Sequence, residues 1–301
     1  MKAFEEAVAL LPPSLRREAQ ALPPLVKRRV EEIRLRSGRP PTAVVGEEEL
    51  PLSALPVEGR DLELTVEIAT RASAHTALES VRQGYFTVRG GHRIGLCGSI
   101  WTEGGQVRNL RRISSLNIRV AHAVPGCGGE ILPQLFQEGR FQSTLLLSPP
   151  GGGKTTLLRD LIRLLSDGAC APPRRVGLAD ERGEVAALWE GTPQFDVGAK
   201  TDVLEGCPKA QGLLMLLRGM NPQILCCDEI TAPADCAALA ECGNCGVKLL
   251  CTVHAEDRED LRRKPLYREL LERGLFEKAV ILRRWTTPRY QVEGLLPCGN
   301  G

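Results

Sequence analysis

The 301-residue chain has few aromatic residues, almost no net charge and no long hydrophobic run. Its 3 Trp, 3 Tyr and 6 Phe are too few to suggest an aromatic surface for stacking nucleic-acid bases. The net charge of +2 argues against a strong field for polyanions. No apolar run approaches the roughly 18 residues that span a bilayer. The first residues, with acids inside a short apolar stretch, do not resemble a secretion signal, so we expect a cytoplasmic protein.

The rest of the composition is typical of a folded protein whose cysteines are reduced. Hydrophobic residues make up 43% and charged residues 25% of the chain, as in soluble globular proteins. The 11 cysteines are odd in number and scattered, which favours free thiols over a disulfide framework. Cys242, Cys245, Cys251 and His254 have spacings similar to those of a zinc site. Because the last two lie on an expected strand, where alternate residues face opposite ways, we favour buried thiols.

The sequence pattern divides the chain into two domains. Residues 1–122 are expected to form a smaller α+β domain. "VEEIRLRSGRPPTAVV" predicts a strand pair, residues 64–84 have helical spacing, and "YFTVRGGHRIGLCGSI" predicts a hairpin that turns at Gly90 and Gly91. Proline and glycine cluster at 125–129, so we place a linker at 123–132.

The second domain, residues 133–301, follows a strand–helix rhythm. Short apolar segments separated by helical patterns predict strands at 143–148, 174–179, 223–227, 247–253 and 279–283. Short apolar strands that alternate with helices are typical of a parallel sheet buried between two helical layers. The predicted fold class is therefore α/β.

The stretch "LLLSPPGGGKTTLLRD" (145–160) resembles a phosphate-binding loop between a strand and a helix. Glycines allow the backbone N–H groups to wrap a phosphate, Lys154 would reach the β- and γ-phosphates, and Thr155 would bind Mg²⁺. Ser148 stands where the usual pattern has its first glycine, a position that needs a bend rather than a phosphate contact. The residues predicted to bind ATP are Ser148, Pro149, Pro150, Gly151, Gly152, Gly153, Lys154, Thr155 and Thr156.

Acidic residues follow two of the predicted strands. "NPQILCCDEI" ends a strand in Asp228 and Glu229; the first would contact Mg²⁺ and the second would polarise the attacking water. "DERGEV" brings Glu181 and Glu184 to the same carboxyl edge of the sheet, and "CTVHAED" brings His254 there. Charged turns and single histidines are often only structural, but their order after the phosphate loop favours ATP hydrolysis.

This order of motifs resembles that of the secretion ATPases of type II and type IV systems and type IV pili. In those proteins the four elements are the Walker A, Asp box, Walker B and His box, and Arg218 matches the arginine that precedes Walker B. Over about residues 30–285 the chain is more specifically similar to the stage III sporulation protein AA family. That likeness rests on "EEIRLRSGRP", "GHRIGLCG", "RRISSLNIRVAH", "SPPGGGKTTLLRD", "DERGEV" and "MNPQILCCDEI". Ser-Pro-Pro before the glycines belongs to that family's pattern.

The resemblance implies a RecA/AAA-like P-loop fold and a mother-cell ATPase that energises a channel to the forespore. It also implies a membrane-anchored partner, the AB protein, and a homo-oligomer, a hexameric ring. In such rings arginines of the N-terminal domain contribute to the phosphate site. Arg93, Arg111, Arg112 and Arg119 lie in or beside predicted strands, and we expect Arg93 and Arg119 to contact phosphate.

The sequence therefore predicts a Mg²⁺-dependent ATPase. Its reaction would use Glu229, with Glu181, Glu184 and His254 beside it, and which carboxylate is the general base is left open. Two alternatives remain. Basic clusters such as "RNLRR" suggest an ATPase that depends on nucleic acid, although the charge and aromatic content oppose it. The other alternative is a scaffold that binds ATP and scarcely hydrolyses it.

Overall fold

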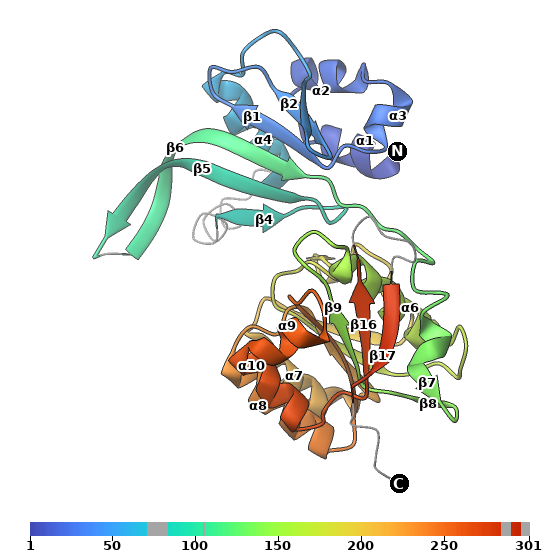
Figure 1. The fold of residues 1–301 in the computed structure, drawn as a ribbon. Helices are drawn as coiled ribbons and strands as arrows, with labels where there is room; N and C mark the ends of the chain where they lie inside the picture. Colours follow the sequence, from blue (N-terminus) through green and yellow to red (C-terminus); the bar gives the residue numbers. More distant parts are fainter. Residues whose placement is uncertain (71–83, 105, 284–289, 296–301) are drawn as a thin grey trace. The chain divides into compact units, whose positions relative to one another are not determined.

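The structure is a computed structural model that describes residues 1–70, 84–104, 106–283 and 290–295. The chain forms two compact units, Met1–His122 (unit 1) and Ala123–Gly301 (unit 2) (Figure 1). Of the helices in the described part, none has the length and apolar character that a membrane crossing requires.

Unit 1 is built on an antiparallel six-stranded sheet of order β3-β2-β1-β6-β5-β4. The predicted strand pair is confirmed, because β1 pairs antiparallel with β2. The strands are β1 (Glu32–Arg36), β2 (Thr42–Val45), β3 (Glu48–Pro51), β4 (Tyr85–Thr87), β5 (Arg93–Glu103) and β6 (Gln106–Arg119). The helices are α1 (Lys2–Val8), α2 (Pro13–Gln20), α3 (Pro24–Lys27) and α4 (Gly59–Thr70).

The core of unit 1 follows from alternation along the strands. In β1, Ile33 and Leu35 are fully buried while their neighbours are partly exposed, so one face of the sheet packs on the helices. Phe4 of α1 belongs to the same cluster. Helix α4 covers the first part of the helix predicted over 64–84, and residues 71–83 of that prediction lie outside the described residues.

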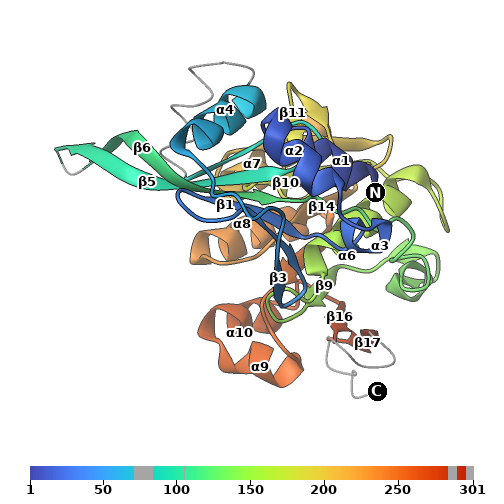
Figure 2. The same cartoon turned by 90° about the horizontal axis from the view of Figure 1, so that it is seen from above.

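The predicted hairpin is confirmed by the antiparallel pairing of β4 with β5, with both turn glycines at positive φ. Beyond Cys97, where the pairing of β4 and of β1 has ended, β5 and β6 continue as a two-stranded ribbon (Figure 2). Register shifts interrupt the ribbon at three places. At one of them a side chain on Gly98 would lie 2.0 Å from the carbonyl oxygen of Arg112, so only glycine fits that bulge.

Unit 2 contains a seven-stranded sheet of order β13-β10-β14-β15-β9-β16-β17, parallel except for the last pair. All five predicted strands are present as β9 (Thr144–Leu147), β10 (Val176–Asp180), β14 (Ile224–Cys227), β15 (Lys248–Val253) and β16 (Lys278–Leu282). The edge strands β13 (Thr201–Glu205) and β17 (Tyr290–Gly294) were not predicted, because their half-buried residues lack the apolar run of a central strand.

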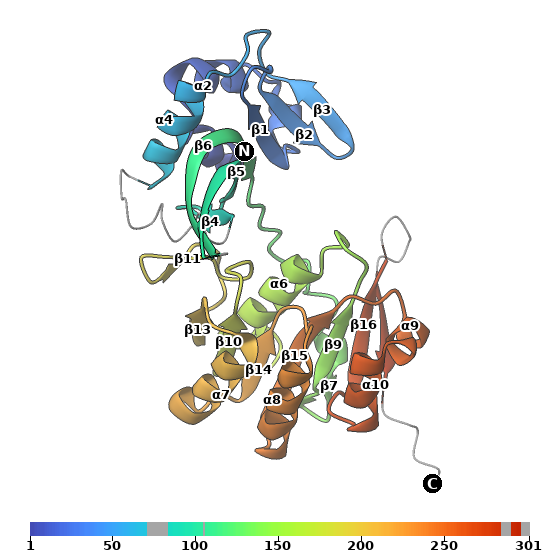
Figure 3. The same ribbon diagram turned by 90° about the vertical axis from the view of Figure 1, so that its left-hand side faces the viewer.

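Alternate residues of the central strands face two separate cores. Leu146 packs with helix α6 (Lys154–Asp167). Leu145 and Leu147 pack on the opposite side, with α7 (Lys209–Met220), α8 (Pro233–Asn244) and α10 (Pro265–Glu272). Helices α7 and α8 lie side by side (Figure 3). The smaller elements are η1 (Leu132–Leu135), β7 (Phe136–Gln137), β8 (Arg140–Phe141), β11 (Leu188–Trp189), β12 (Thr192–Pro193) and α9 (Arg258–Arg263).

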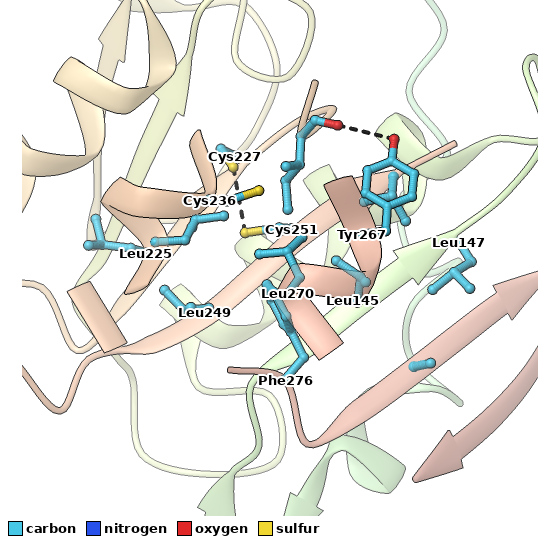
Figure 4. Packing of buried hydrophobic residues seen from close by; sticks show 14 of the residues in the cluster. Leu145, Leu147, Leu225, Cys227, Cys236, Leu249, Cys251, Tyr267, Leu270 and Phe276 are labelled. Carbon is cyan, nitrogen blue, oxygen red and sulfur yellow. Dashed lines mark hydrogen bonds between the residues drawn. The ribbon is translucent and has the colours of Figure 1, made fainter. Parts of the chain in front are cut away.

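The second of these cores contains buried cysteines beneath the carboxyl ends of the strands (Figure 4). The Sγ atoms of Cys227 and Cys251, on neighbouring strands, lie 3.5 Å apart. Their hydrogen bond and burial raise the pKa of Cys227 well above its ordinary value. Tyr267 of α10 donates its hydroxyl hydrogen to the carbonyl oxygen of Ile230, at 3.2 Å. This core therefore holds the end of β14 at Cys227 and the following loop at Ile230.

The segment 123–132, predicted as a linker, is hydrogen-bonded to unit 2. The backbone N–H groups of Gly126 and Gly128 donate to the carboxylate of Asp160 in α6, at 3.0 and 2.8 Å. A side chain at Gly128 would approach Leu161 to 2.9 Å. This segment is thus anchored to α6, the helix that directly follows the Gly-rich loop.

Because His92 is fully buried, we expect unit 1 to lose stability at low pH. Its Nδ1 accepts the backbone N–H of Ala121 at 3.0 Å, and burial, with help from His122, lowers its pKa to about 4. Because the unfolded chain binds the proton more readily, stability falls as the pH drops from about 6.5 toward 4, by on the order of 3 kcal/mol.

The measurement is the free energy of unfolding of the wild type and of His92→Asn between pH 4 and 7.5. Asparagine keeps an acceptor for Ala121 but cannot take the proton. The difference between the two proteins should shrink as the pH falls. A constant difference across the range would contradict the role of His92.

Candidate functional site

Four loops of unit 2 meet at one edge of the sheet, where parallel strands end. They follow β10, β14, β15 and β9, which are four consecutive strands of the sheet. Carboxyl ends of parallel strands form the usual ligand crevice of an α/β sheet. The Gly-rich loop, the predicted acids and His254 all lie on these four loops, so the tertiary fold brings the predicted residues together.

The Gly-rich loop runs from β9 into the N-terminus of α6. Gly151 and Gly153 have φ of 72° and 91°, a region that residues with a Cβ rarely adopt. Gly153 directly precedes α6, a helix of 14 residues. The free N–H groups and the positive end at the start of such a helix are groups that could hold an anion.

Ser148 closes the base of this loop. It is fully buried, and its Oγ donates to the carbonyl oxygen of Pro149 at 2.8 Å. A side chain on Gly152 would lie 1.9 Å from that Oγ. The serine in place of the usual glycine is therefore accommodated by the glycine four residues later, while Pro149 and Pro150 line a neighbouring hollow with His254.

Lys154, Glu229 and His254 come from three different loops and meet at one carboxylate oxygen. The Nζ of Lys154 donates to Oε1 of Glu229 at 2.8 Å, and Nε2 of His254 lies 2.9 Å from the same oxygen. The Nδ1 of His254 is buried without a hydrogen-bond partner among the described residues. The tautomer that carries hydrogen on Nε2 therefore leaves no buried N–H unpaired, and Nε2 donates to Glu229.

Glu229 has an unusual backbone and a lowered pKa. Its φ of 52° is rare for a residue with a side chain, and such strain concentrates at functional sites. Burial alone would raise the pKa of Glu229, but the hydrogen bond and charge of Lys154, together with the hydrogen bond from His254, lower it below its ordinary value. Its second oxygen accepts from Arg182 at 3.0 Å. The carboxylate is thus ionised and held on three sides.

A second set of hydrogen bonds joins the phosphate loop to the strand ends. Thr155 donates from Oγ1 to Oδ2 of Asp228 at 2.7 Å. Thr252 of β15 donates to Oδ1 of Asp228 and accepts the backbone N–H of Glu229 at 2.8 Å. A hydroxyl and a carboxylate side by side are oxygen donors that suit Mg²⁺, which takes few protein ligands and completes its shell with phosphate and water. The residues present therefore fit this ion.

Asp180 organises the loop after β10 and is almost fully buried. Its carboxylate accepts the backbone N–H groups of Glu184, Val185 and Ala186 at 2.8–3.0 Å. The carbonyl oxygens of Glu184 and Val185 in turn accept from the guanidinium of Arg159. This network leads us to assign Asp180 a structural role in a loop that carries Glu181, Arg182 and Glu184.

A small hollow between the β10 and β14 loops gathers most of the acids. Glu181 pairs there with the Nζ of Lys209, at 2.8 Å. The hollow is lined by Asp180, Glu181, Arg182, Glu184, Lys209, Asp228 and Glu229. The structure therefore brings all four predicted acids, Glu181, Glu184, Asp228 and Glu229, to one place.

The cysteines considered for zinc lie in different surroundings. Cys242 is buried in α8 and Cys245 is exposed, while Cys251 packs against Cys227 and His254 contacts Glu229. Burial raises the pKa of Cys242 to about 12. Within the described ranges, no group of three or more His, Cys, Asp or Glu residues is arranged to hold a metal ion by itself.

Arg93 and Arg119 belong to unit 1, where they are register partners on β5 and β6. The guanidinium of Arg93 stacks on Tyr85, 3.8 Å from the ring centroid, and Arg119 is exposed. The two arginines lie side by side at one end of these neighbouring strands, where β5 begins and β6 ends, and form a basic pair within unit 1.

Sequence reasoning missed Thr252 and Lys209. Threonine in a buried strand is ordinary, so nothing in "LLCTVHA" marks Thr252 as the residue that connects Asp228 to Glu229. Lys209 carried a signal, because a lysine opens an otherwise apolar helix in "PKAQGLLMLL" and lysine is seldom buried unless it is paired.

The fold of the chain is similar to that of solved ATPases from secretion and pilus systems. The ATPase DotB of Yersinia pseudotuberculosis superposes with a TM-score of 0.59 at 16% identity, covering 93% of this chain and 78% of that chain. The pilus retraction motor PilT with bound ADP gives a TM-score of 0.53 at 15% identity, covering 86% and 77%. At these identities the likeness establishes the fold.

The particular family follows from sequence similarity. The family model for sporulation stage III, protein AA, matches residues 2–296. The Stage III sporulation protein AA of Bacillus subtilis (strain 168) is 37% identical over 286 residues, covering 95% of this chain and 92% of that protein. The chain belongs to the sporulation stage III protein AA family.

The contact between Ser148 and Gly152 predicts a strong coupling between the two positions. Gly152→Ala should lower the free energy of unfolding by about 1–3 kcal/mol, because the new Cβ meets a buried Oγ. In a Ser148→Gly background the same change should cost at least about 1 kcal/mol less, since that Oγ is gone.

Denaturant unfolding of the four proteins in this cycle measures the coupling. The Pro149 carbonyl oxygen, at 3.2 Å from the added Cβ, leaves part of the cost in place. Equal costs of Gly152→Ala in both backgrounds would show that the Ser148 side chain does not limit this turn.

Proposed function

We propose that this chain is a Mg²⁺-dependent ATPase of the secretion ATPase type. The observation that carries the proposal is the convergence of Lys154, Thr155, Asp228 and Glu229, from two loops, within 2.7–2.8 Å of one another in pairs. A lysine and a hydroxyl on the phosphate loop, facing two acids at a strand end, are the groups that ATP hydrolysis requires.

The chain's own residues would divide the work as follows. Backbone N–H groups of residues 151–154 and the Lys154 ammonium group would bind the phosphates of ATP. Glu229 would orient the attacking water and accept its proton, since its carboxylate is ionised and fixed by Arg182 and His254. His254 would hold Glu229 in place through Nε2. Glu181 and Glu184 are the nearby acids that would assist.

Thr155 and Asp228 are the residues that would hold Mg²⁺, with Thr252 keeping Asp228 in position. When bound, the ion would offset negative charge on the transferred phosphate. The hydroxyl of Thr155 lies against Asp228, so the two oxygen donors that would hold the ion are adjacent.

Unit 1 would contribute positive charge to the reaction. Arg93 and Arg119 form the basic pair described above, and an arginine that reaches the developing charge on the γ-phosphate accelerates phosphoryl transfer by a large factor. We propose these two as the candidates of unit 1 for that role.

Membership of the sporulation family supports a cellular role. We propose that hydrolysis powers or gates a channel complex between mother cell and forespore. The ATPase would work in the mother-cell cytoplasm as a homo-oligomer, a hexameric ring. A membrane-anchored protein of the same complex, the AB protein, would be its partner. We do not propose a nucleic-acid partner, because the chain has a net charge of only +2 and few aromatics.

Lys154→Ala and Glu229→Gln should each lower ATP turnover by about 100-fold or more, because they remove phosphate binding and water activation. Lys154→Ala should also weaken nucleotide binding, whereas Glu229→Gln should keep it. Phosphate release assays and binding of a fluorescent ATP analogue measure the two effects. Glu269→Gln is the matched control, because Glu269 is a partly exposed acid of α10 that pairs with Arg273. Intact turnover in both site variants would refute the proposal.

The solution mass of Glu229→Gln protein tests the assembly. With Mg²⁺ and a non-hydrolysable ATP analogue, light scattering should give the mass of six 32.8-kDa chains, and without nucleotide a smaller one. A protein that binds the analogue and stays monomeric would speak against a ring formed by this chain alone. Binding without turnover in the wild type would instead favour the nucleotide-gated scaffold.

A further inference from the structure

Lys209 is a buried lysine at an unfavourable position. It is 5% exposed and is the first residue of α7, where the positive end of the helix disfavours a cation. Burial of an ammonium group is strongly unfavourable unless partners compensate for it. An uncharged residue at this position would avoid both the burial of a charge and its repulsion by the helix end. The charge of Lys209 therefore needs groups that stabilise it.

Two carboxylates from different loops compensate Lys209. Its Nζ lies 2.8 Å from Oε2 of Glu181 and 3.8 Å from Oδ2 of Asp235. Burial alone would lower the pKa of Lys209, but the hydrogen bond to Glu181 and the charge of Asp235 raise it above the ordinary value. Lys209 is therefore a permanent cation at this edge of the sheet.

The partners of Lys209 belong to the loops that carry the acids of the site. Glu181 directly follows β10. Asp235 accepts the backbone N–H groups of Thr231 and Ala232, both at 3.0 Å, and so closes the turn that begins at Asp228 and Glu229. Lys209 thus connects the loop after β10 with the loop after β14.

The hollow between the β10 and β14 loops carries more negative than positive charge, so the position of Lys209 matters for it. Five acidic side chains line it, and the only basic side chains among its described lining residues are Lys209 and Arg182. Arg182 is 56% exposed and directed to Glu229, which leaves Lys209 as the buried cation next to Glu181. Loss of its charge would leave Glu181 without this partner, close to Asp228.

We propose that Lys209 is a positioning residue that holds Glu181 and the turn after Glu229 at a fixed spacing and limits the negative charge around Mg²⁺. This role rests on the proposed ATPase function. The ligand of the site it tunes is a magnesium–nucleoside triphosphate complex. In this role Lys209 acts through Glu181 and Asp235, the two carboxylates that it contacts.

The test compares Lys209→Met with Lys209→Arg in two measurements. Lys209→Met should lower kcat about tenfold or more with little change in the affinity for the ATP analogue. It should also lower the Mg²⁺ concentration that half-saturates analogue binding, by about tenfold, because a positive charge near the ion is lost. Lys209→Arg keeps the charge and should restore the Mg²⁺ dependence to within about threefold of the wild type.

Lys248→Met is the matched control, because it breaks a lysine–glutamate pair of unit 2 at the start of β15, with Glu277 at 2.5 Å. It should change stability without shifting the Mg²⁺ dependence. The double variant Lys209→Met with Glu181→Gln removes both charges, so its Mg²⁺ half-saturation should return toward the wild-type value. If Lys209→Met does not fold, Lys209→Gln replaces it, since its amide can still donate to Glu181.

The outcomes separate the two proposals. A wild-type protein that hydrolyses ATP, with wild-type kcat and Mg²⁺ dependence in the Lys209 variants, overturns the role of Lys209 alone. Shifts that Lys248→Met reproduces also overturn it, because they would reflect general loss of stability. A wild-type protein without ATP turnover overturns the proposed function, and the role of Lys209 with it.

Discussion

The ion pair between Lys154 and Glu229 is the interaction on which the rest of the site depends. It joins the phosphate loop to the loop after β14, across β15, which lies between their strands. Both groups are largely buried, so each charge needs the other. His254 and Arg182 then attach to the same carboxylate, and two further loops are drawn into one charged cluster.

The charged residues keep their positions because the strand ends beneath them are tightly packed. Cys227 and Cys251 stand in register beneath Asp228 and Thr252, and their small side chains allow α8 and α10 to pack closely on the strands. Apolar residues hold the strand ends, and the polar residues just beyond them reach the site. The buried carboxylate of Asp180 also has a structural part here, because it accepts backbone N–H groups of its own loop.

Much of the fold could be predicted from the sequence. The five central strands of unit 2 are short apolar runs because both of their faces are covered, and that pattern needs no knowledge of the partners. The edge strands β13 and β17 escaped prediction for the opposite reason. Their residues are only half-buried, so pairing with β10 and β16 decides their conformation more than their own composition does.

By itself the sequence determined the Gly-rich loop between β9 and α6, the acids after β10 and β14, and their order along the chain. Local chemistry is enough for these features, since glycines, a lysine and strand-end acids carry their signal within a few residues. Only the tertiary structure decided that Thr252 connects Asp228 to Glu229, that Asp180 faces its own loop, and that Lys209 meets Glu181 and Asp235. These contacts join residues that are adjacent only because parallel strands align their ends, and the order of strands in a sheet is not written in any single segment.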